Sequence, residues 1–154
     1  MDRIDSGRRT IAAPPETVYQ ALLDRESLEA WLPPEGMRGR IEHWDPRPGG
    51  GFRMTLTYLD ASAASGKSSD ATDVVEVGFA DLVPAERVVQ QAVFESGDPA
   101  FAGTMTMTWE LAAAGDGTEV TVTATDVPPG IGQADHEAGI ASSLANLASF
   151  AEAR

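Results

Sequence analysis

The sequence predicts an α+β fold in which a curved, mostly antiparallel sheet of about six or seven strands wraps around one long C-terminal helix. The first observation is that Ile140, Leu144, Leu147 and Ala151 recur at helical spacing near the C-terminus. The second is that segments of alternating apolar and polar residues fill most of the chain between residues 38 and 125. The third is a pair of short helical segments, marked by prolines, that follow the first strand.

The N-terminal part is predicted to hold one strand and two short helices. Residues 8–12 form the strand, and Pro14 and Pro15 begin a helix, because a missing backbone N–H costs nothing in the first turn. Residues 24–31 continue as a second short helix, and the two prolines that follow Leu32 end it.

Residues 38–45 are predicted to form the next strand. Strict alternation would place Ile41, His43 and Asp45 on one face. It would place Trp44 on the other face. The pattern leaves open which of the two faces is inside.

Five more strands are predicted, separated by turns rich in Gly, Pro and Asp; they cover residues 52–58, 74–83, 87–94, 104–111 and 120–125. Alternation directs one set of side chains to the core: Phe52, Met54, Leu56, Tyr58, Met105, Met107, Trp109 and Leu111. Gln90 and Gln91 weaken the pattern of their strand. Residues 60–73 are small and polar, and are predicted to form a mobile hairpin loop.

The 154 residues suffice for one domain with its own core, so residues 1–154 are interpreted as a single domain. The chain has no cysteine, which fits a reducing compartment. The polar N-terminus does not resemble a signal peptide, and no apolar run is long enough to cross a bilayer, so the expected location is cytoplasmic. A net charge of −13 repels phosphates and anionic lipids, so neither nucleic acid nor a membrane is an expected partner.

Several short motifs, in a fixed order along the chain, carry a resemblance to a known family. They are IAAPPETVY at 11–19, LEAWLPPEG at 28–36, DPRPGGGF at 45–52, VPAERVV at 83–89, GDGTEVT at 115–121 and HEAG at 136–139. With them the sequence resembles the START-like (SRPBCC) superfamily and, within it, bacterial stand-alone relatives of the C-terminal domain of the activator of heat-shock-protein-90 ATPase. The resemblance covers nearly the whole chain and implies the helix-grip fold. It leaves the function open, because the superfamily hosts lipid carriers, antibiotic-resistance proteins, polyketide cyclases and chaperone cofactors.

The sequence departs from the family pattern at two places near the expected cavity mouth. The family often has paired tryptophans where this chain has Trp31 and Leu32. It often has an aromatic residue where this chain has Ile140. Both changes are expected to reshape the cavity.

A helix laid across a curved sheet leaves a cavity between them, and small ligands bind in such concave apolar sites. The candidate ligand-binding residues are the inward-facing side chains of these elements: Trp31, Phe52, Met54, Tyr58, Met105, Met107, Trp109, His136, Ile140 and Leu144. The flexible methionine thioethers favour binding. The alternative is that these periodic apolar side chains only fill the core.

His136 is the one candidate for a catalytic role, because it lies one turn before Ile140 on the face that grips the sheet. It could hydrogen-bond a ligand or move a proton, or it could bond only backbone or solvent at the helix end. His43 and Asp45 could reach the same cavity if their face of the strand is the inner one. Asp45 more often forms a turn-stabilising ion pair, here with Arg47.

No metal ion or other cofactor is expected. The two histidines are far apart and no cysteine is present, so no recognisable metal-ligand spacing occurs. No serine sits in a nucleophile elbow. The glycines at 49–51 precede a strand rather than a helix N-terminus, and therefore do not form a phosphate-binding loop.

The sequence thus leads to one hypothesis of function and two alternatives. The hypothesis is a non-enzymatic protein that binds a small apolar or aromatic molecule between its sheet and its C-terminal helix. One alternative is a cyclase-like or hydrolase-like enzyme with His136 as acid or base. The other is a stress-response interaction module that resembles the chaperone-ATPase activator and has a chaperone as its partner. A homodimer formed through exposed sheet edges is a further partner hypothesis.

Overall fold

The computed structural model describes residues 3–33, 36–58 and 72–153, and it confirms the predicted α+β fold. The described strands form one antiparallel seven-stranded sheet in the order β1-β7-β6-β5-β4-β3-β2. These strands are β1 (Ile4–Ile11), β2 (Met37–Asp45), β3 (Gly51–Tyr58), β4 (Thr72–Val83), β5 (Arg87–Phe94), β6 (Met105–Ala114) and β7 (Gly117–Thr125). The helices are α1 (Pro15–Leu22), α2 (Arg25–Trp31) and α3 (Gln133–Glu152), with a short 3-10 turn at Pro99–Phe101.

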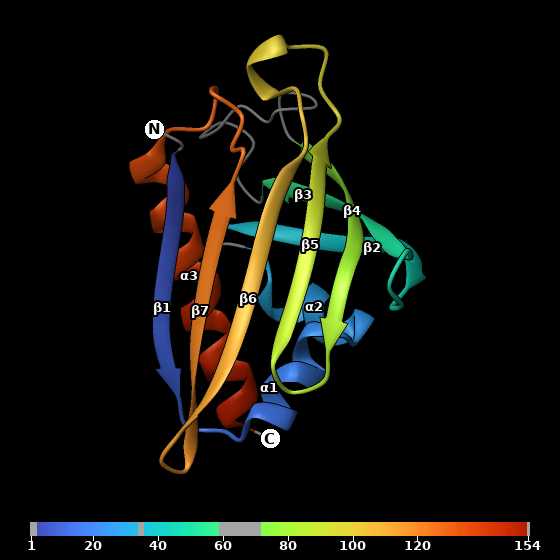
Figure 1. The fold of residues 1–154 in the computed structure, drawn as a ribbon. Helices are drawn as coiled ribbons and strands as arrows, with labels where there is room; N and C mark the ends of the chain where they lie inside the picture. Colours follow the sequence, from blue (N-terminus) through green and yellow to red (C-terminus); the bar gives the residue numbers. More distant parts are fainter. Residues whose placement is uncertain (1–2, 34–35, 59–71, 154) are drawn as a thin grey trace.

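The sheet is strongly curved, and its inner face is concave. In Figure 1, α3 lies behind β1 and β7, and β2 and β3 cross behind the remaining strands. The short helices α1 and α2 close the lower end of this half-barrel in the same view. None of the helices within the described ranges is long and apolar enough to cross a membrane.

Only β5 begins at the predicted residue; β2, β3 and β6 differ by one residue, and β7 begins at Gly117 rather than at residue 120. β1 begins at Ile4 rather than at residue 8, because it pairs with β7 along its whole length, from Ile4 opposite Thr125 to Ile11 opposite Thr118. β4 begins at Thr72, which pairs with Thr57, so the last two residues of the predicted loop at 60–73 belong to the sheet. The rest of that loop lies outside the described residues.

The second strand corrects one prediction about side-chain direction. The register of β2 shifts between Glu42 and Asp45, and His43 takes a φ of 57°. This bulge reverses the alternation, so Trp44 packs on the inner face against Phe52, with ring centroids 5.5 Å apart. The prediction that Trp44 lies on the face opposite Ile41 is therefore wrong, because strict alternation ignores a bulge.

The outcome for His43 and Asp45 also follows from this bulge. Ile41 is fully buried, yet the His43 side chain is exposed and does not enter the cavity. Asp45 forms the expected turn ion pair, with Arg47 Nε 2.6 Å from Oδ1.

The helix α3 packs closely on β1 because Gly7 has no side chain. A Cβ atom there would lie 2.6 Å from Cγ2 of Ile140. Helix side chains also hydrogen-bond the backbone at the outer sheet edges. Glu137 of α3 accepts a bond of 3.0 Å from the N–H of Ser6 on edge strand β1, and Glu152 accepts one of 2.9 Å from the N–H of Ala12, just after that strand.

The other edge strand, β2, is bonded in the same way, since Glu29 of α2 accepts a 2.7 Å bond from the N–H of Ile41. Helix side chains therefore satisfy part of the edge backbone on both sides of the sheet.

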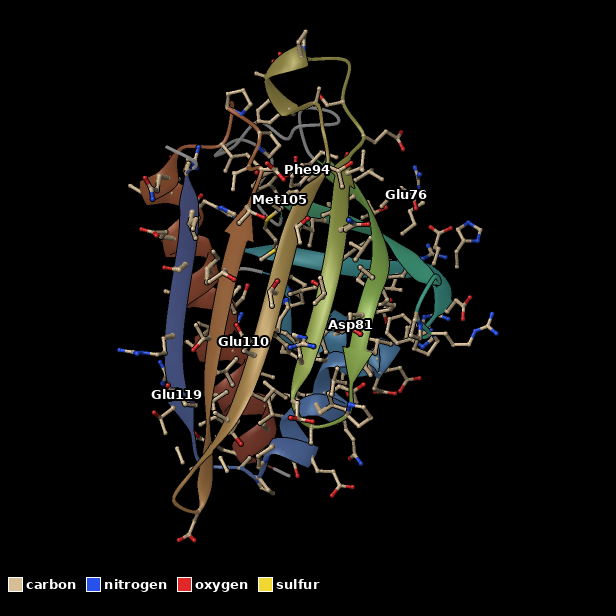
Figure 2. All side chains as sticks on the ribbon, viewed as in Figure 1. Glu76, Asp81, Phe94, Met105, Glu110 and Glu119 are labelled. Atoms are coloured by element: carbon tan, nitrogen blue, oxygen red, sulfur yellow. The ribbon has the colours of Figure 1, made fainter. Side chains whose placement is uncertain are left out.

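The outer face of the sheet is polar. Figure 2 looks onto this face, where Glu76, Glu110 and Glu119 project from β4, β6 and β7. Arg53 bridges Glu76 and Glu95, with N–O distances of 2.9 and 2.6 Å. The apolar side chains consequently gather on the inner face, against α3.

Candidate functional site

A cavity of about 200 Å³ lies between the inner face of the sheet and the N-terminal half of α3. We call it the sheet–helix pocket. Most of its lining comes from β3, β4, β5 and β6: Phe52, Met54, Leu56, Val75, Val77, Gln90, Ala92, Phe94, Met105, Met107 and Trp109. The remaining lining residues are Leu32, which follows α2, and His136, Gly139, Ile140 and Ser143 of α3. The pocket is apolar apart from a few side chains.

Seven of the ten residues that the sequence singled out come together here: Phe52, Met54, Met105, Met107, Trp109, His136 and Ile140. They face one another because the in-facing positions of adjacent strands stack side by side under the helix. Phe94 and Met105 lie close together at the upper end of the sheet in Figure 2, where β5 ends and β6 begins.

The other three residues are not among the lining residues in the described part of the chain. Trp31 is fully packed behind Trp109, their rings meeting edge to face at 5.7 Å, and its Nε1 donates to the carbonyl of Ala21. Leu144 is buried one turn further along α3, where its Cδ1 lies 3.3 Å from the place a Cβ of Gly7 would occupy. Tyr58 stands at the end of β3 with its hydroxyl 3.5 Å from Oδ2 of Asp73.

Nine of the lining residues were not among the candidates, and Gln90 is the one of them that brings a side-chain amide to the pocket. It appeared only as a weakness in the strand pattern, although the signal was present, because Val88, Gln90 and Ala92 share one face of β5. Gln90 is only 6% exposed. A glutamine at a buried in-facing position needs hydrogen-bond partners, and that requirement could have marked it.

Gln90 is bonded to Trp109. The indole Nε1 of Trp109 donates a hydrogen bond to Oε1 of Gln90 at 3.1 Å. Because an indole N–H can only donate, it must face the amide oxygen, and this determines which way the amide is turned. The NH₂ group of Gln90 is therefore left for another acceptor.

His136 is held by a buried carboxylate. Its Nδ1 lies 2.7 Å from Oδ2 of Asp5, which is fully buried on β1. Arg3 binds the same carboxylate through two bonds of 2.8 and 2.7 Å. The Arg3 guanidinium first, and then the His136 ring, hold the pKa of Asp5 below its usual value, against the opposite effect of burial.

An ionised Asp5 only accepts hydrogen bonds, so the proton of the pair stays on Nδ1 of His136. The other ring nitrogen, Nε2, makes no hydrogen bond to any described residue. Since His136 lines the sheet–helix pocket, Nε2 is the nitrogen that a bound molecule could use.

Two polar side chains of the pocket, those of His136 and Gln90, lie far apart across the sheet. Asp5 of β1 pairs with Ala124, Ala124 with Met107, and Met107 with Gln90. Asp5 and Gln90 therefore occupy one cross-strand row, three strand spacings or about 14 Å apart. His136 stands over one end of this row and Gln90 forms the other.

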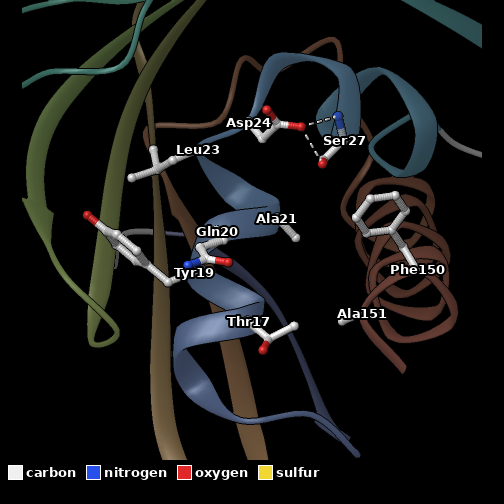
Figure 3. Close-up of a pocket in the computed structure, with 9 residues that line it drawn as sticks. All are labelled: Thr17, Tyr19, Gln20, Ala21, Leu23, Asp24, Ser27, Phe150 and Ala151. Carbon is white, nitrogen blue, oxygen red and sulfur yellow. Dashed lines mark hydrogen bonds between the residues drawn. The ribbon is translucent and has the colours of Figure 1, made fainter. Parts of the chain in front are cut away.

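A second hollow, of about 460 Å³, lies around α1 near the C-terminal end of α3. Figure 3 shows Phe150 and Ala151 of α3 on one side of α1, with Tyr19 and Leu23 projecting from the other side. Although its volume is larger, its lining is divided by the helix and includes exposed polar side chains.

One of those polar side chains already has a structural role, because Asp24 caps α2 by accepting bonds from the backbone N–H and the hydroxyl of Ser27. The sheet–helix pocket is therefore the better candidate site. Among the described residues, no group of three or more His, Asp or Glu side chains could hold a metal ion.

These features define a class of protein: an α+β domain whose curled antiparallel sheet grips a long C-terminal helix and leaves an apolar pocket between them. The chain belongs to the family described as activator of Hsp90 ATPase homolog 1-like protein, whose model matches residues 12–152, and thereby to the SRPBCC superfamily. This confirms the resemblance drawn from the motifs.

Solved bacterial structures share the fold over nearly the whole chain. Protein CV1439 from Chromobacterium violaceum is 30% identical, with a TM-score of 0.85, and the match covers 97% of this chain and 96% of that one. A protein from Arthrobacter aurescens is 15% identical with a TM-score of 0.80, covering 98% and 87%. Protein MLL2253 from Mesorhizobium loti is 19% identical with a TM-score of 0.72, covering 97% of each chain. No match among curated proteins is significant.

Proposed function

We propose that this protein binds a small apolar or aromatic molecule in the sheet–helix pocket. The observation that carries the proposal is a hollow of about 200 Å³ at the edge of the core cluster, partly open to solvent and lined by apolar side chains from four strands and one helix. Apolar side chains that face water in such a hollow cost free energy. A bound apolar molecule removes that cost and makes van der Waals contacts with the side chains that line the pocket.

The size of the pocket limits the ligand. Pockets for drug-sized molecules measure roughly 300–1,000 Å³, so this pocket suits a smaller molecule such as one with a single aromatic ring. Met105 and Met107 on its wall can adjust their shape to such a ligand, and both are in-facing residues of β6.

Gly139 offers a direct way to close the pocket. It lines the pocket from α3, and a Cβ atom on it would meet no atom within 4 Å. The Cβ of a larger residue therefore has room there, and the substitution Gly139→Leu should fill the hollow. Ala141, two residues further along α3, is exposed, so Ala141→Leu is a matched control.

The experiment is a titration of ¹⁵N-labelled protein with small aromatic probes such as acetophenone, followed by amide NMR. We expect the signals of Trp109, Met107 and Ile140 to shift in the native protein and in Ala141→Leu. They should stay in place in Gly139→Leu. Shifts of equal size in Gly139→Leu would contradict binding in this pocket.

A second candidate function is supported by the Asp5–His136 pair. A carboxylate that holds Nδ1 of a histidine leaves Nε2 ready to take up or give a proton, as in many acid–base sites. If the protein is an enzyme of the cyclase or hydrolase kind, His136→Ala should abolish turnover and keep probe binding. Full activity of that variant would contradict the role.

A further inference from the structure

We infer that the ligand of the sheet–helix pocket carries an acceptor oxygen, such as a carbonyl, to which the side-chain amide of Gln90 donates a hydrogen bond. This inference rests on the proposed function and adds the chemical class of the ligand. It makes Gln90 the residue that distinguishes an oxygen-bearing apolar molecule from a pure hydrocarbon.

The first step of the argument is the direction of the amide. Trp109 is a donor only, so its 3.1 Å bond to Gln90 assigns the oxygen to the indole and the NH₂ group to the opposite side. Trp109 is itself 2% exposed and wedged against Trp31, with ring centroids 5.7 Å apart. The amide therefore has a rigid partner that holds its orientation.

The second step concerns the NH₂ group. In the described residues, the bond from Trp109 is the single hydrogen bond of the Gln90 side chain. Within the same part of the chain, every side-chain nitrogen or oxygen that is closed off from solvent has a partner. The unpartnered Nε2 must therefore keep some accessible surface, although the residue is 94% buried. Because Gln90 is an in-facing residue of β5 and lines the sheet–helix pocket, we expect that surface to face the pocket.

The third step concerns the residues that surround Gln90. The residues nearest to Gln90 in the register are Met107 on β6 and Phe79 on β4, and neither can accept a strong hydrogen bond from it. A hydrocarbon ligand would seal the donor in an apolar site and leave it unsatisfied, which is costly. A ligand with an oxygen at that place satisfies the donor, so the pocket selects for it.

The test uses matched pairs of probes that differ in one group. Acetophenone and α-methylstyrene have the same shape, but only the ketone has an acceptor oxygen, and 1-indanone and 1-methyleneindane form a second pair. We expect the native protein to bind each ketone roughly three to ten times more tightly than its alkene, the range that one net hydrogen bond supplies. The side-chain NH₂ signals of Gln90 should shift with the ketones and not with the alkenes.

Two substitutions assign the preference to Gln90. Gln90→Leu should bring the affinity ratio of ketone to alkene close to one. Gln90→Glu keeps an acceptor for Trp109 but replaces the donor, and it should favour the alkene. Gln91 is exposed on the other face of the same strand, so Gln91→Leu and Gln91→Glu are controls that should keep the ratio of the native protein.

The outcomes separate the two proposals. Equal binding of ketones and alkenes to the native protein, with an unmoved Gln90 NH₂ signal, would overturn the inference and leave the pocket as a binding site. If no probe of either kind moves the signals of the pocket residues, the proposed function fails, and the inference with it. Because the NH₂ signals are read in the native protein, the test does not depend on the variants folding.

Discussion

Asp5 and His136 are joined by a 2.7 Å hydrogen bond that ties the edge strand β1 to the first turns of α3. Asp5 is fully buried, and Arg3, which directly precedes β1, binds the same carboxylate. The contact thus has two consequences. It anchors the N-terminal half of the helix that roofs the pocket, and it presents the other nitrogen of His136 to whatever the pocket holds.

The first prediction concerns acid stability. Because the pKa of Asp5 in the fold lies below its ordinary value of 3.8, its ionised form stabilises the fold above that pH. This contribution is lost as the pH falls from about 3.8 through the lower folded pKa. For Asp5→Asn we expect a lower free energy of unfolding at neutral pH than for the unsubstituted protein. This free energy should also fall less steeply as the pH is lowered. Urea unfolding between pH 2.5 and 7 measures both effects.

The matched control for this prediction is Asp45→Asn. Asp45 also pairs with an arginine two residues away, but its side chain is 38% exposed, so solvent screens the pair. Its pH profile should follow that of the native protein. A profile of Asp5→Asn that runs parallel to the native one would contradict the role given to Asp5.

The second prediction concerns the close approach of β1 and α3. In Gly7→Ala the new Cβ would lie 2.6 Å from Cγ2 of Ile140, so the Ile140 side chain must shift or the strand and the helix must move apart. We expect a loss of about 1–3 kcal/mol in the free energy of unfolding, the usual cost of overpacking. Gly78→Ala is the control, because its Cβ would meet nothing nearer than 3.8 Å. If Gly7→Ala and Gly78→Ala lower the free energy of unfolding by the same amount, the proposed clash with Ile140 is not the cause of the loss.

The third prediction concerns the bulge in β2. His43 adopts a φ of 57°, a left-handed conformation that costs a residue with a Cβ about 1 kcal/mol or more, and its side chain is exposed. His43→Gly should therefore raise the free energy of unfolding by about 1 kcal/mol in chemical denaturation. A destabilised variant would show that the His43 side chain makes a contact that stabilises the bulge.

The fourth prediction is that one substitution, at Gly139, raises the stability of the fold and weakens the binding of a probe. Gly139 lies within α3, where alanine is favoured over glycine by about 1 kcal/mol. Gly139→Ala should raise the melting temperature and, because its methyl group enters the pocket, weaken probe binding. Thermal unfolding and the NMR titration measure the two effects on one sample. A variant that gains stability and keeps full affinity would place Gly139 outside the binding surface.

The architecture could be predicted because its signals are local. Alternation directed Met105 and Trp109 inward, and helical spacing gave the buried stripe of Ile140 and Leu144. Prolines marked the start of α1 and the end of α2. These patterns depend only on neighbours in the chain, so they survive without knowledge of the partners.

The features that escaped prediction depend on residues distant in sequence. The bulge that turns Trp44 inward comes from the register of β2 on β3. The orientation of the Gln90 amide depends on its hydrogen bond with Trp109. The orientation of the His136 ring depends on its bond with Asp5, which lies 131 positions earlier in the chain. The one local signal for Gln90 is a polar residue at an in-facing strand position, which alternation alone counts only as a weakened pattern.

The most direct test of the central claim is native mass spectrometry of the purified protein, compared with the same sample under denaturing conditions and with Gly139→Leu. If the pocket holds a small apolar molecule, the native protein will carry an added mass that denaturation releases and that Gly139→Leu lacks. The released molecule should contain an oxygen. Native and denatured masses that agree, even after incubation with acetophenone, would contradict the claim that this pocket is a binding site.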